Sequence, residues 1–192
     1  MKYKEIEYKW IADHVRRSRF NVDMLKLIKQ QKHEYDFVRC AGPDFYYSNK
    51  DGFCARHRSG GDTNELTVKR RIGDTAITVR RETNLKLDRT VTALDVMQFF
   101  KDLGFGTDVR IHKDCDIYFI RDGRAEVDIV WYKVTSNGRT RQFIEVEVGG
   151  LSKQDSLRVL NRWASHVEKM FKLKNKSDLS LYEIYSGRRY RS

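Results

Sequence analysis

The sequence predicts an α+β fold: an eight-stranded antiparallel β-barrel that forms a polar tunnel, with helices packed on the outside. Three observations predict this fold. Eight stretches alternate apolar and polar residues and are separated by turn-forming segments. Three others carry apolar residues at helical spacing. The polar face of the strands carries charges at every second position, which suits the lining of a barrel better than a loosely mixed solvated face.

The predicted strands follow one another along most of the chain. In order, they cover residues 4–11, 44–49, 52–58, 65–72, 76–83, 108–121, 125–134 and 140–148. The segments "SNKDG", "SGGDTN", "IGDT", "IRDG" and "TSNG" between them are rich in residues that favour turns. This succession favours a large antiparallel sheet or barrel.

Helices are predicted at 21–33 after the cap candidate Asn21, at 92–105, and at 152–173. The last helix carries an apolar stripe that we expect to dock on the barrel: Trp163, Val167, Met170 and Phe171. With one proline and no low-complexity linker, we expect one domain over 1–192. Its barrel covers about 3–150 and its C-terminal helical segment about 152–192.

Composition limits the partners of the chain. The net charge of +11, from 38 Lys and Arg against 27 Asp and Glu, indicates an anionic partner: nucleic acid, an anionic membrane surface or a polyphosphate. The three cysteines include no CxxC pair, so neither a disulfide framework nor a zinc site is indicated. No apolar run reaches the roughly 18 residues of a membrane span, and no signal peptide is visible. We expect a soluble, cytoplasmic protein.

The charges on the strands are segregated by sign. Acids lie on the first and last predicted strands, in "EIE" (5–7) and "EVE" (145–147), and bases lie on the strands between them. For any single strand a solvated face with cross-strand ion pairs is the simpler interpretation, but it does not explain this separation. Carboxylates are the ligands that Mg²⁺ and Mn²⁺ prefer, and a triphosphate needs several Arg and Lys side chains. The pattern therefore indicates a tunnel for a metal-bound triphosphate.

Five motifs in this order resemble a known family. They are E-x-E-x-K (Glu5, Glu7, Lys9), R-x-R (Arg56, Arg58), "LTVKRR" with Lys69, R-x-E (Arg80, Glu82) and a late E-x-E (Glu145, Glu147). The chain resembles the CYTH domain of the triphosphate tunnel metalloenzymes, which include class IV adenylyl cyclases, thiamine triphosphatases and inorganic triphosphatases. The similarity runs from about residue 3 to residue 150, and the order of the motifs is more specific than any one of them.

The resemblance implies roles for these side chains. The implied metal ligands are Glu5, Glu7, Asp128, Glu145 and Glu147, for one or two ions of Mg²⁺ or Mn²⁺. The implied phosphate-binding residues are Lys9, Arg56, Arg58, Lys69, Arg71, Arg80 and Lys113. The implied catalytic residues are Glu5, Glu7, Lys9 and Glu82, the last of which positions basic side chains or a metal-bound water.

Two positions depart from the family pattern and leave alternatives open. The strand 108–121 offers Arg110 or Lys113 to the tunnel, in an ambiguous register, and has Cys115 where an Arg is expected. Glu126 is an alternative ligand to Asp128.

The function that the resemblance implies is metal-dependent hydrolysis of the terminal phosphoanhydride of a triphosphate: inorganic tripolyphosphate, thiamine triphosphate or a nucleoside triphosphate. The alternatives are cyclisation of ATP to cyclic AMP and pyrophosphate, hydrolysis of the 5′-triphosphate of RNA, and a non-catalytic nucleotide- or polyphosphate-binding module. The expected partners are a small triphosphate or an RNA 5′ end and no membrane, with the protein a monomer or a homodimer.

Overall fold

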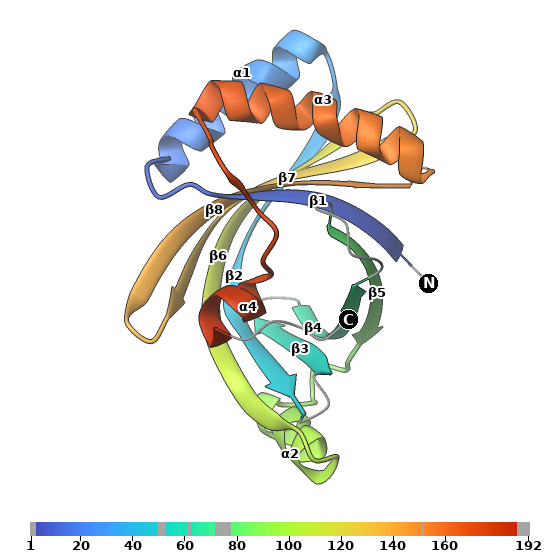
Figure 1. The fold of residues 1–192 in the computed structure, drawn as a ribbon, viewed down its shortest axis with the longest axis vertical. Helices are drawn as coiled ribbons and strands as arrows, with labels where there is room; N and C mark the ends of the chain where they lie inside the picture. Colours follow the sequence, from blue (N-terminus) through green and yellow to red (C-terminus); the bar gives the residue numbers. More distant parts are fainter. Residues whose placement is uncertain (1–2, 50–52, 61–62, 72–77, 151, 188–192) are drawn as a thin grey trace.

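The strands form one antiparallel sheet, shown in Figure 1. The computed structural model describes residues 3–49, 53–60, 63–71, 78–150 and 152–187. Its strands are β1 (Tyr3–Ile11), β2 (Glu34–Ser48), β3 (Cys54–Gly60), β4 (Thr63–Arg71), β5 (Thr78–Lys86), β6 (Gly106–Asp122), β7 (Ala125–Ser136), β8 (Arg139–Gly149) and β9 (Lys176–Ser177). Its helices are α1 (Arg17–Gln31), α2 (Ala93–Asp102), α3 (Lys153–Phe171) and α4 (Leu181–Ser186).

The sheet returns on itself through β1. The strand order is β5-β4-β3-β2-β6-β7-β8-β1, and β1 also pairs with β5, so eight strands form a continuous ring. In the β1–β8 ladder Glu7 lies opposite Glu147 and Lys9 lies opposite Glu145. The remaining edge of β1, at Lys9 and Trp10, pairs with the short β9. The predicted antiparallel barrel is confirmed.

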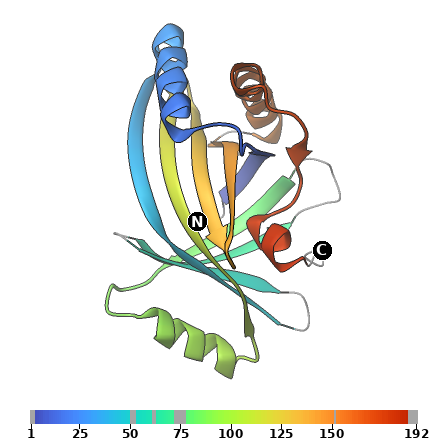
Figure 2. The same cartoon turned by 90° about the vertical axis from the view of Figure 1, so that its left-hand side faces the viewer.

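The largest apolar core lies between the outer face of the barrel and the two long helices. Figures 1 and 2 show α1 and α3 together over β1, β7 and β8. Ile6 and Trp10 point outward from β1 and are fully buried in this core, beside Trp163 and Val167 of α3. Each such side chain contributes roughly 1.5–3 kcal/mol through its burial. The predicted docking stripe of the last helix is confirmed, with Phe171 buried and Met170 partly buried.

α2 lies at the opposite end of the molecule from α1 and α3 (Figures 1 and 2). It begins with a capping box in which Thr92 accepts a hydrogen bond from the Asp95 amide and Asp95 accepts one from the Thr92 amide. Its buried residues Val96 and Phe100 pack with Tyr47, whose ring stacks on Phe100 at 4.5 Å between centroids. The helix predicted at 92–105 is confirmed.

Some boundaries differ from the prediction. β2 begins ten positions earlier, at Glu34, because the whole strand Glu34–Ser48 pairs with β6, whereas its pairing with β3 covers only Asp44–Ser48. Pro43 lies in the part of β2 that pairs with β6 and precedes the pairing with β3. A proline is tolerated at such an edge because it has no amide hydrogen to donate to a second strand. α1 begins at Arg17, and Asn21 does not cap it. The sequence prediction also omitted β9 and α4. Positions 52, 72, 76 and 77 of the predicted strands lie outside the described residues.

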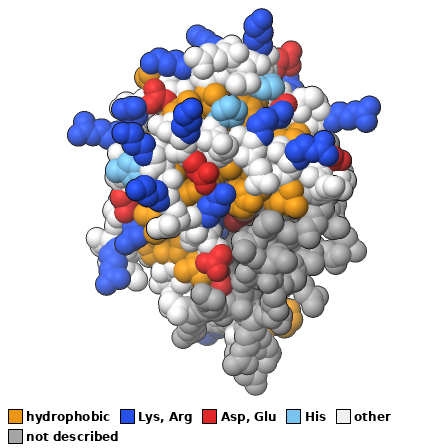
Figure 3. All heavy atoms as spheres, turned by 45° about the horizontal axis from the view of Figure 1, so that its top comes forward, with side chains coloured by type: hydrophobic (Ala, Val, Ile, Leu, Met, Phe, Trp, Pro, Cys, Tyr) orange, Lys and Arg blue, Asp and Glu red, His pale blue; other side chains and the backbone are white. Residues whose placement is uncertain are grey.

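Figure 3 shows the face of the molecule on which α1 and α3 lie, and most of its charged side chains are basic. They account for part of the net charge of +11. Among the helices that the structure describes, none combines the length and the apolar character needed to cross a membrane.

Candidate active site in a charged cavity

A cavity of about 700 Å³ is lined by both polar and apolar side chains of the strands. Its lining includes Arg56 and Arg58 of β3, Lys113 and Cys115 of β6, Glu126 and Asp128 of β7, and Glu145 and Glu147 of β8. A smaller cavity of about 50 Å³ shares Arg56, Lys113 and Glu145 with it and adds Glu7 and Lys9. Because the two cavities share these residues, they adjoin within the barrel.

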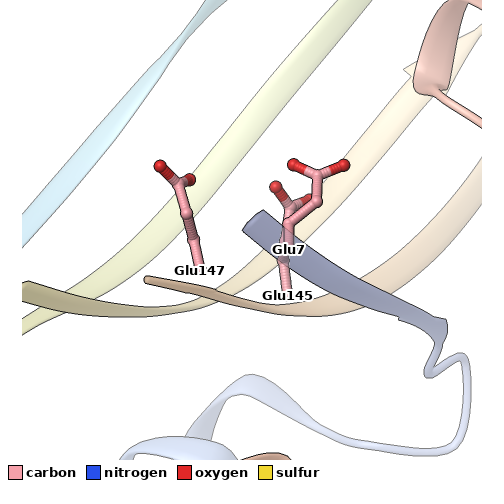
Figure 4. Close-up of side chains that lie close together, drawn as sticks. All are labelled: Glu7, Glu145 and Glu147. Carbon is pink, nitrogen blue, oxygen red and sulfur yellow. The ribbon is translucent and has the colours of Figure 1, made fainter. Parts of the chain in front are cut away.

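Three carboxylates meet on the β1–β8 wall of this space. Oxygen atoms of Glu7, Glu145 and Glu147 all lie within 4.8 Å of one another. Figure 4 shows the three side chains pointing to the same side of the sheet, Glu7 from β1 and the other two from β8. Their proximity follows from alternation and register, because Glu145 and Glu147 share one face of β8 and Glu7 is the cross-strand partner of Glu147.

Lys9 lies among these acids. Its Nζ is 3.2 Å from Glu7 and 3.6 Å from Glu145, and the side chain is 4% exposed. One ammonium offsets part of the charge of the three carboxylates. A set of hard oxygen ligands with excess negative charge fits a divalent cation such as Mg²⁺ or Mn²⁺.

Tyr132 of β7 connects the acidic and basic parts of the cavity wall. Its hydroxyl donates a hydrogen bond to Glu145 at 2.7 Å, and the ring stacks on Phe143. Lys113 Nζ lies 3.9 Å from the centroid of the Tyr132 ring. Burial, followed by the charge of Glu145, raises the Tyr132 pKa well above its ordinary value. Tyr132 therefore remains a protonated donor to Glu145.

The basic side chains of β3 lie on the far side of the ring. The strand order places β3 four positions from β8 around the eight-stranded ring, so Arg56 and Arg58 face the acidic wall across the cavity. Arg56 donates a hydrogen bond to Thr67 at 2.9 Å. Arg58 donates two to the carboxylate of Asp44, at 2.7 and 2.8 Å. These contacts fix two guanidinium groups beside the space that an anion would fill.

Asp44 is fully buried. Burial raises its pKa, but the hydrogen bond and positive charge of Arg58 outweigh this effect and leave the pKa at about 2. Asp44 is therefore ionised at neutral pH and holds Arg58 in place.

The structure distinguishes Lys113 from Arg110, and it places both Asp128 and Glu126 at the cavity. Lys113 lines both cavities, whereas the guanidinium of Arg110 lies 5.2 Å from the centroid of the Phe45 ring. Asp128 and Glu126 both line the large cavity, and Asp128 is the cross-strand partner of Glu147. The three-carboxylate cluster itself consists of Glu7, Glu145 and Glu147.

The side chains of Glu5, Lys69, Arg71, Arg80 and Glu82 lie outside the described residues. Backbone pairing places Glu5 opposite Arg80, and it places Lys69 opposite Glu82 and Arg71 opposite Arg80.

Sequence reasoning missed Asp44 and Tyr132. A hairpin between the predicted strands 44–49 and 52–58 brings Asp44 opposite Arg58, so the register of that hairpin could have revealed the pair. Tyr132 lies four residues after Asp128 on β7 and so shares its face, but a buried tyrosine in an apolar run gives no separate signal.

The chain is similar in structure to several solved proteins. A conserved hypothetical protein from Pyrococcus furiosus is 19% identical, with a TM-score of 0.66 over 93% of this chain and 98% of that one. A protein from Pyrococcus horikoshii is 17% identical, with a TM-score of 0.65 over 96% and 99% of the two chains. A candidate adenylate cyclase from Bacillus halodurans is 14% identical, with a TM-score of 0.57 over 96% and 98%.

The chain shares the fold of these three proteins. The fold expected from the resemblance to the CYTH family is thus confirmed, and at these identities the likeness is one of fold. No protein-family model and no curated protein matches the sequence. In this barrel the acidic wall can hold a hard cation, while the basic side chains of the opposite wall can hold an anion.

Proposed function

We propose that the protein is a divalent-metal-dependent triphosphatase that hydrolyses the terminal phosphoanhydride of its substrate inside the tunnel. The observation that carries this proposal is the cluster of Glu7, Glu145 and Glu147 in the same connected space as several cations. These cations include Arg56, Arg58 and Lys113.

The carboxylate cluster would hold Mg²⁺ or Mn²⁺, with Asp128 and Glu5 as further candidate ligands. When bound, the cation supplies Lewis-acid polarisation of a phosphoryl oxygen. The chain's own side chains do the rest of the positioning. Arg56, Arg58 and Lys113 bind the phosphate oxygens. Lys69, Arg71 and Arg80, whose backbone pairing puts them at positions of the same strand face, are further candidates for this role. Charge that spreads over the phosphoryl oxygens in the transition state is stabilised by these fixed cations.

Lys9 has a role in this proposal that differs from the one the resemblance implies. Its ammonium pairs with both Glu7 and Glu145. We place it between the metal-binding and phosphate-binding parts of the site. Glu82 remains a candidate for orienting basic side chains or a water.

A product assay tests the proposed reaction. Tripolyphosphate, thiamine triphosphate, ATP and 5′-triphosphorylated RNA are each incubated with Mg²⁺ or Mn²⁺, and phosphate and pyrophosphate are measured separately. We expect phosphate from at least one substrate, no turnover with a chelator, and recovery when the metal is returned. No turnover of any substrate would favour a binding module.

Matched variants test the site. Glu7→Gln and Glu147→Gln keep the shape of the side chain but remove a charged ligand, and we expect each to lower metal-dependent turnover by about 100-fold. Asp23→Asn on the surface of α1, where Asp23 pairs with Arg19, serves as the control. Unchanged metal-dependent turnover in both glutamate variants would show that the metal site is wrongly assigned.

Cyclisation of ATP is the second candidate, because a candidate adenylate cyclase is among the similar structures. It predicts cyclic AMP and pyrophosphate from ATP in place of phosphate, so the same assay separates the two reactions.

A further inference from the structure

Two cysteines face each other across the wall of the cavity. Cys40 of β2 and Cys115 of β6 are direct cross-strand partners, and both line the large cavity. Neither belongs to the metal cluster or to the phosphate-binding residues of the proposed function. Cys40 is exposed, whereas Cys115 is 5% exposed.

The geometry of the pair suits a covalent bond. Residues directly opposite in antiparallel strands have Cα atoms about 4.5–5.5 Å apart, which lies within the range of about 4.4–6.8 Å found in disulfides. Their Cβ atoms are typically about 4.5–5.5 Å apart, so a small approach of the two strands reaches the disulfide spacing of about 3.5–4.5 Å. The two thiols interact, because Cys115 lowers the Cys40 pKa.

The surroundings differ from those of a structural cysteine. The neighbouring Cys115 thiol, followed by the positive charges of Arg58 and Lys113, lowers the Cys40 pKa, against the opposing effect of burial. The Cys115 pKa is raised by the neighbouring Cys40 thiol and by burial. An accessible thiol in a positive environment beside a buried second thiol is the arrangement of a reactive cysteine and its resolving partner.

We propose that Cys40 and Cys115 form a reversible disulfide when the protein meets a peroxide. The Cys40 thiolate attacks one oxygen of hydrogen peroxide, so that an S–O bond forms, the O–O bond breaks, and the departing hydroxide takes a proton to become water. The Cys115 sulfur then attacks the Cys40 sulfur. An S–S bond forms, the S–O bond breaks, and hydroxide leaves with the Cys115 proton as a second water. A dithiol reductant reverses the bond by exchange.

This modification site fits a chain in a reducing compartment, where disulfides are transient and respond to oxidants. It is independent of the proposed triphosphatase activity, and its test requires no substrate.

The test uses hydrogen peroxide on the full-length folded protein. Trypsin separates the cysteines into the peptides 40–50, 51–56 and 114–121. We expect the denatured product to show one titratable thiol in place of three, a loss of the mass of two hydrogen atoms, and a cross-link between peptides 40–50 and 114–121. Dithiothreitol should restore all three thiols.

Variants supply the controls. Cys54 is buried and donates its Sγ hydrogen to the Ala55 carbonyl, so Cys54→Ser should leave the cross-link unchanged. Cys40→Ser and Cys115→Ser should each abolish it, and Cys115→Ser should accumulate sulfenic acid at Cys40, trapped with dimedone. At neutral pH, Cys40 should react with iodoacetamide roughly ten-fold faster than Cys54.

Two outcomes would overturn the proposal. One is that the folded wild-type protein keeps Cys40 and Cys115 reduced, or over-oxidises them without a cross-link. The other is that either residue bonds to Cys54 as readily as to its partner. Because both outcomes are read from the wild-type protein, the test holds even if a serine variant fails to fold. Oxidation of the protein in urea serves as the reference, because it gives the disulfide cross-links that form without the folded geometry.

Discussion

Asp44 is a single residue with a clear energetic role, because its carboxylate holds the cavity-lining Arg58 in place. The carboxylate is fully buried and accepts two hydrogen bonds from Arg58. Removing one member of such a pair leaves the other charge uncompensated. The position of Arg58 and the stability of the barrel therefore depend on the same contact.

We expect Asp44→Asn to lower the free energy of unfolding at pH 7 by about 3 kcal/mol, since it breaks a buried pair. The native pKa of about 2 lies below the ordinary value of 3.8, so the stabilisation is present above about pH 4 and is lost as the pH falls through 2. Urea unfolding at several pH values measures this, and the difference between wild type and variant should shrink toward pH 2.

Asp36 provides the matched control for Asp44. Its side chain is 69% exposed and pairs with Arg121 at the surface. Asp36→Asn should change stability by less than about 0.5 kcal/mol. Equal losses in the two variants would contradict the role assigned to the buried pair.

Tyr132 offers a second prediction, which rests on the proposed metal site. Tyr132→Phe removes the hydrogen bond that orients Glu145, and we expect apparent Mg²⁺ or Mn²⁺ affinity to fall about ten-fold. The rise of the melting temperature with metal concentration measures this affinity. Tyr185→Phe, which removes a hydroxyl bonded to the Val134 carbonyl, should leave it unchanged. If both variants bind metal like the wild type, the Tyr132 hydroxyl has no part in the site.

Among the elements, α4 is the least expected from sequence and contributes to one cavity wall. It is six residues long, begins at a Ser180–Glu183 capping box, and places Ser180 and Leu181 along the small cavity. Tyr182 is 4% exposed, contacts the Tyr46 ring and donates a hydrogen bond to Asp108 at 2.8 Å. Leu181, Ile184 and Tyr185 pack in the same apolar cluster, and Tyr182 adds a hydrogen bond to its ring contact.

Substitution of Tyr182 tests how α4 is attached. We expect Tyr182→Ala to cost about 3 kcal/mol of stability, because it removes a buried ring. Tyr182→Phe, which loses only the hydrogen bond to Asp108, should cost about 1 kcal/mol. Urea unfolding gives both values, and hydrogen exchange of the Ile184 and Gly187 amides reports whether α4 opens separately. A negligible cost for the alanine variant would show that other contacts hold the helix.

How far the sequence predicts these elements depends on how much of each lies against a core. Strict alternation predicted β1, β7 and β8, and it placed Glu7, Glu145 and Glu147 on one face. The first part of β2 is exposed on both faces, so its sequence shows no sustained alternation of apolar and polar residues that would predict a strand. α4 and β9 are too short for a periodic signal, and their positions are set by tertiary contacts. Strand register, on which the Asp44–Arg58 and Cys40–Cys115 pairs depend, likewise requires the folded sheet.

For the whole molecule, the net charge of +11 and the basic face over α1 and α3 predict electrostatic attraction of polyanions. We expect single-stranded RNA to bind with an affinity that falls linearly on a log–log plot against salt, by about 0.7 for each phosphate neutralised. Fluorescence anisotropy from low to high salt measures the slope. RNA without a 5′-triphosphate serves as the control and should keep most of the slope, because the surface contacts do not read the 5′ end. An affinity that is independent of salt would contradict this prediction.

The closure of the ring through β1 has a consequence for how the protein folds. The first strand reaches its final neighbours only when β5 and the late strand β8 are available, so its contacts are among the most distant in sequence. Chains dominated by such non-local pairing fold slowly, and unpaired strand edges favour aggregation until they close. Glu7 meets Glu145 and Glu147 when β1 pairs with β8. A cation that binds this cluster therefore recognises only a chain in which these two strands have paired, and it should favour completion of folding as well as any reaction inside the tunnel.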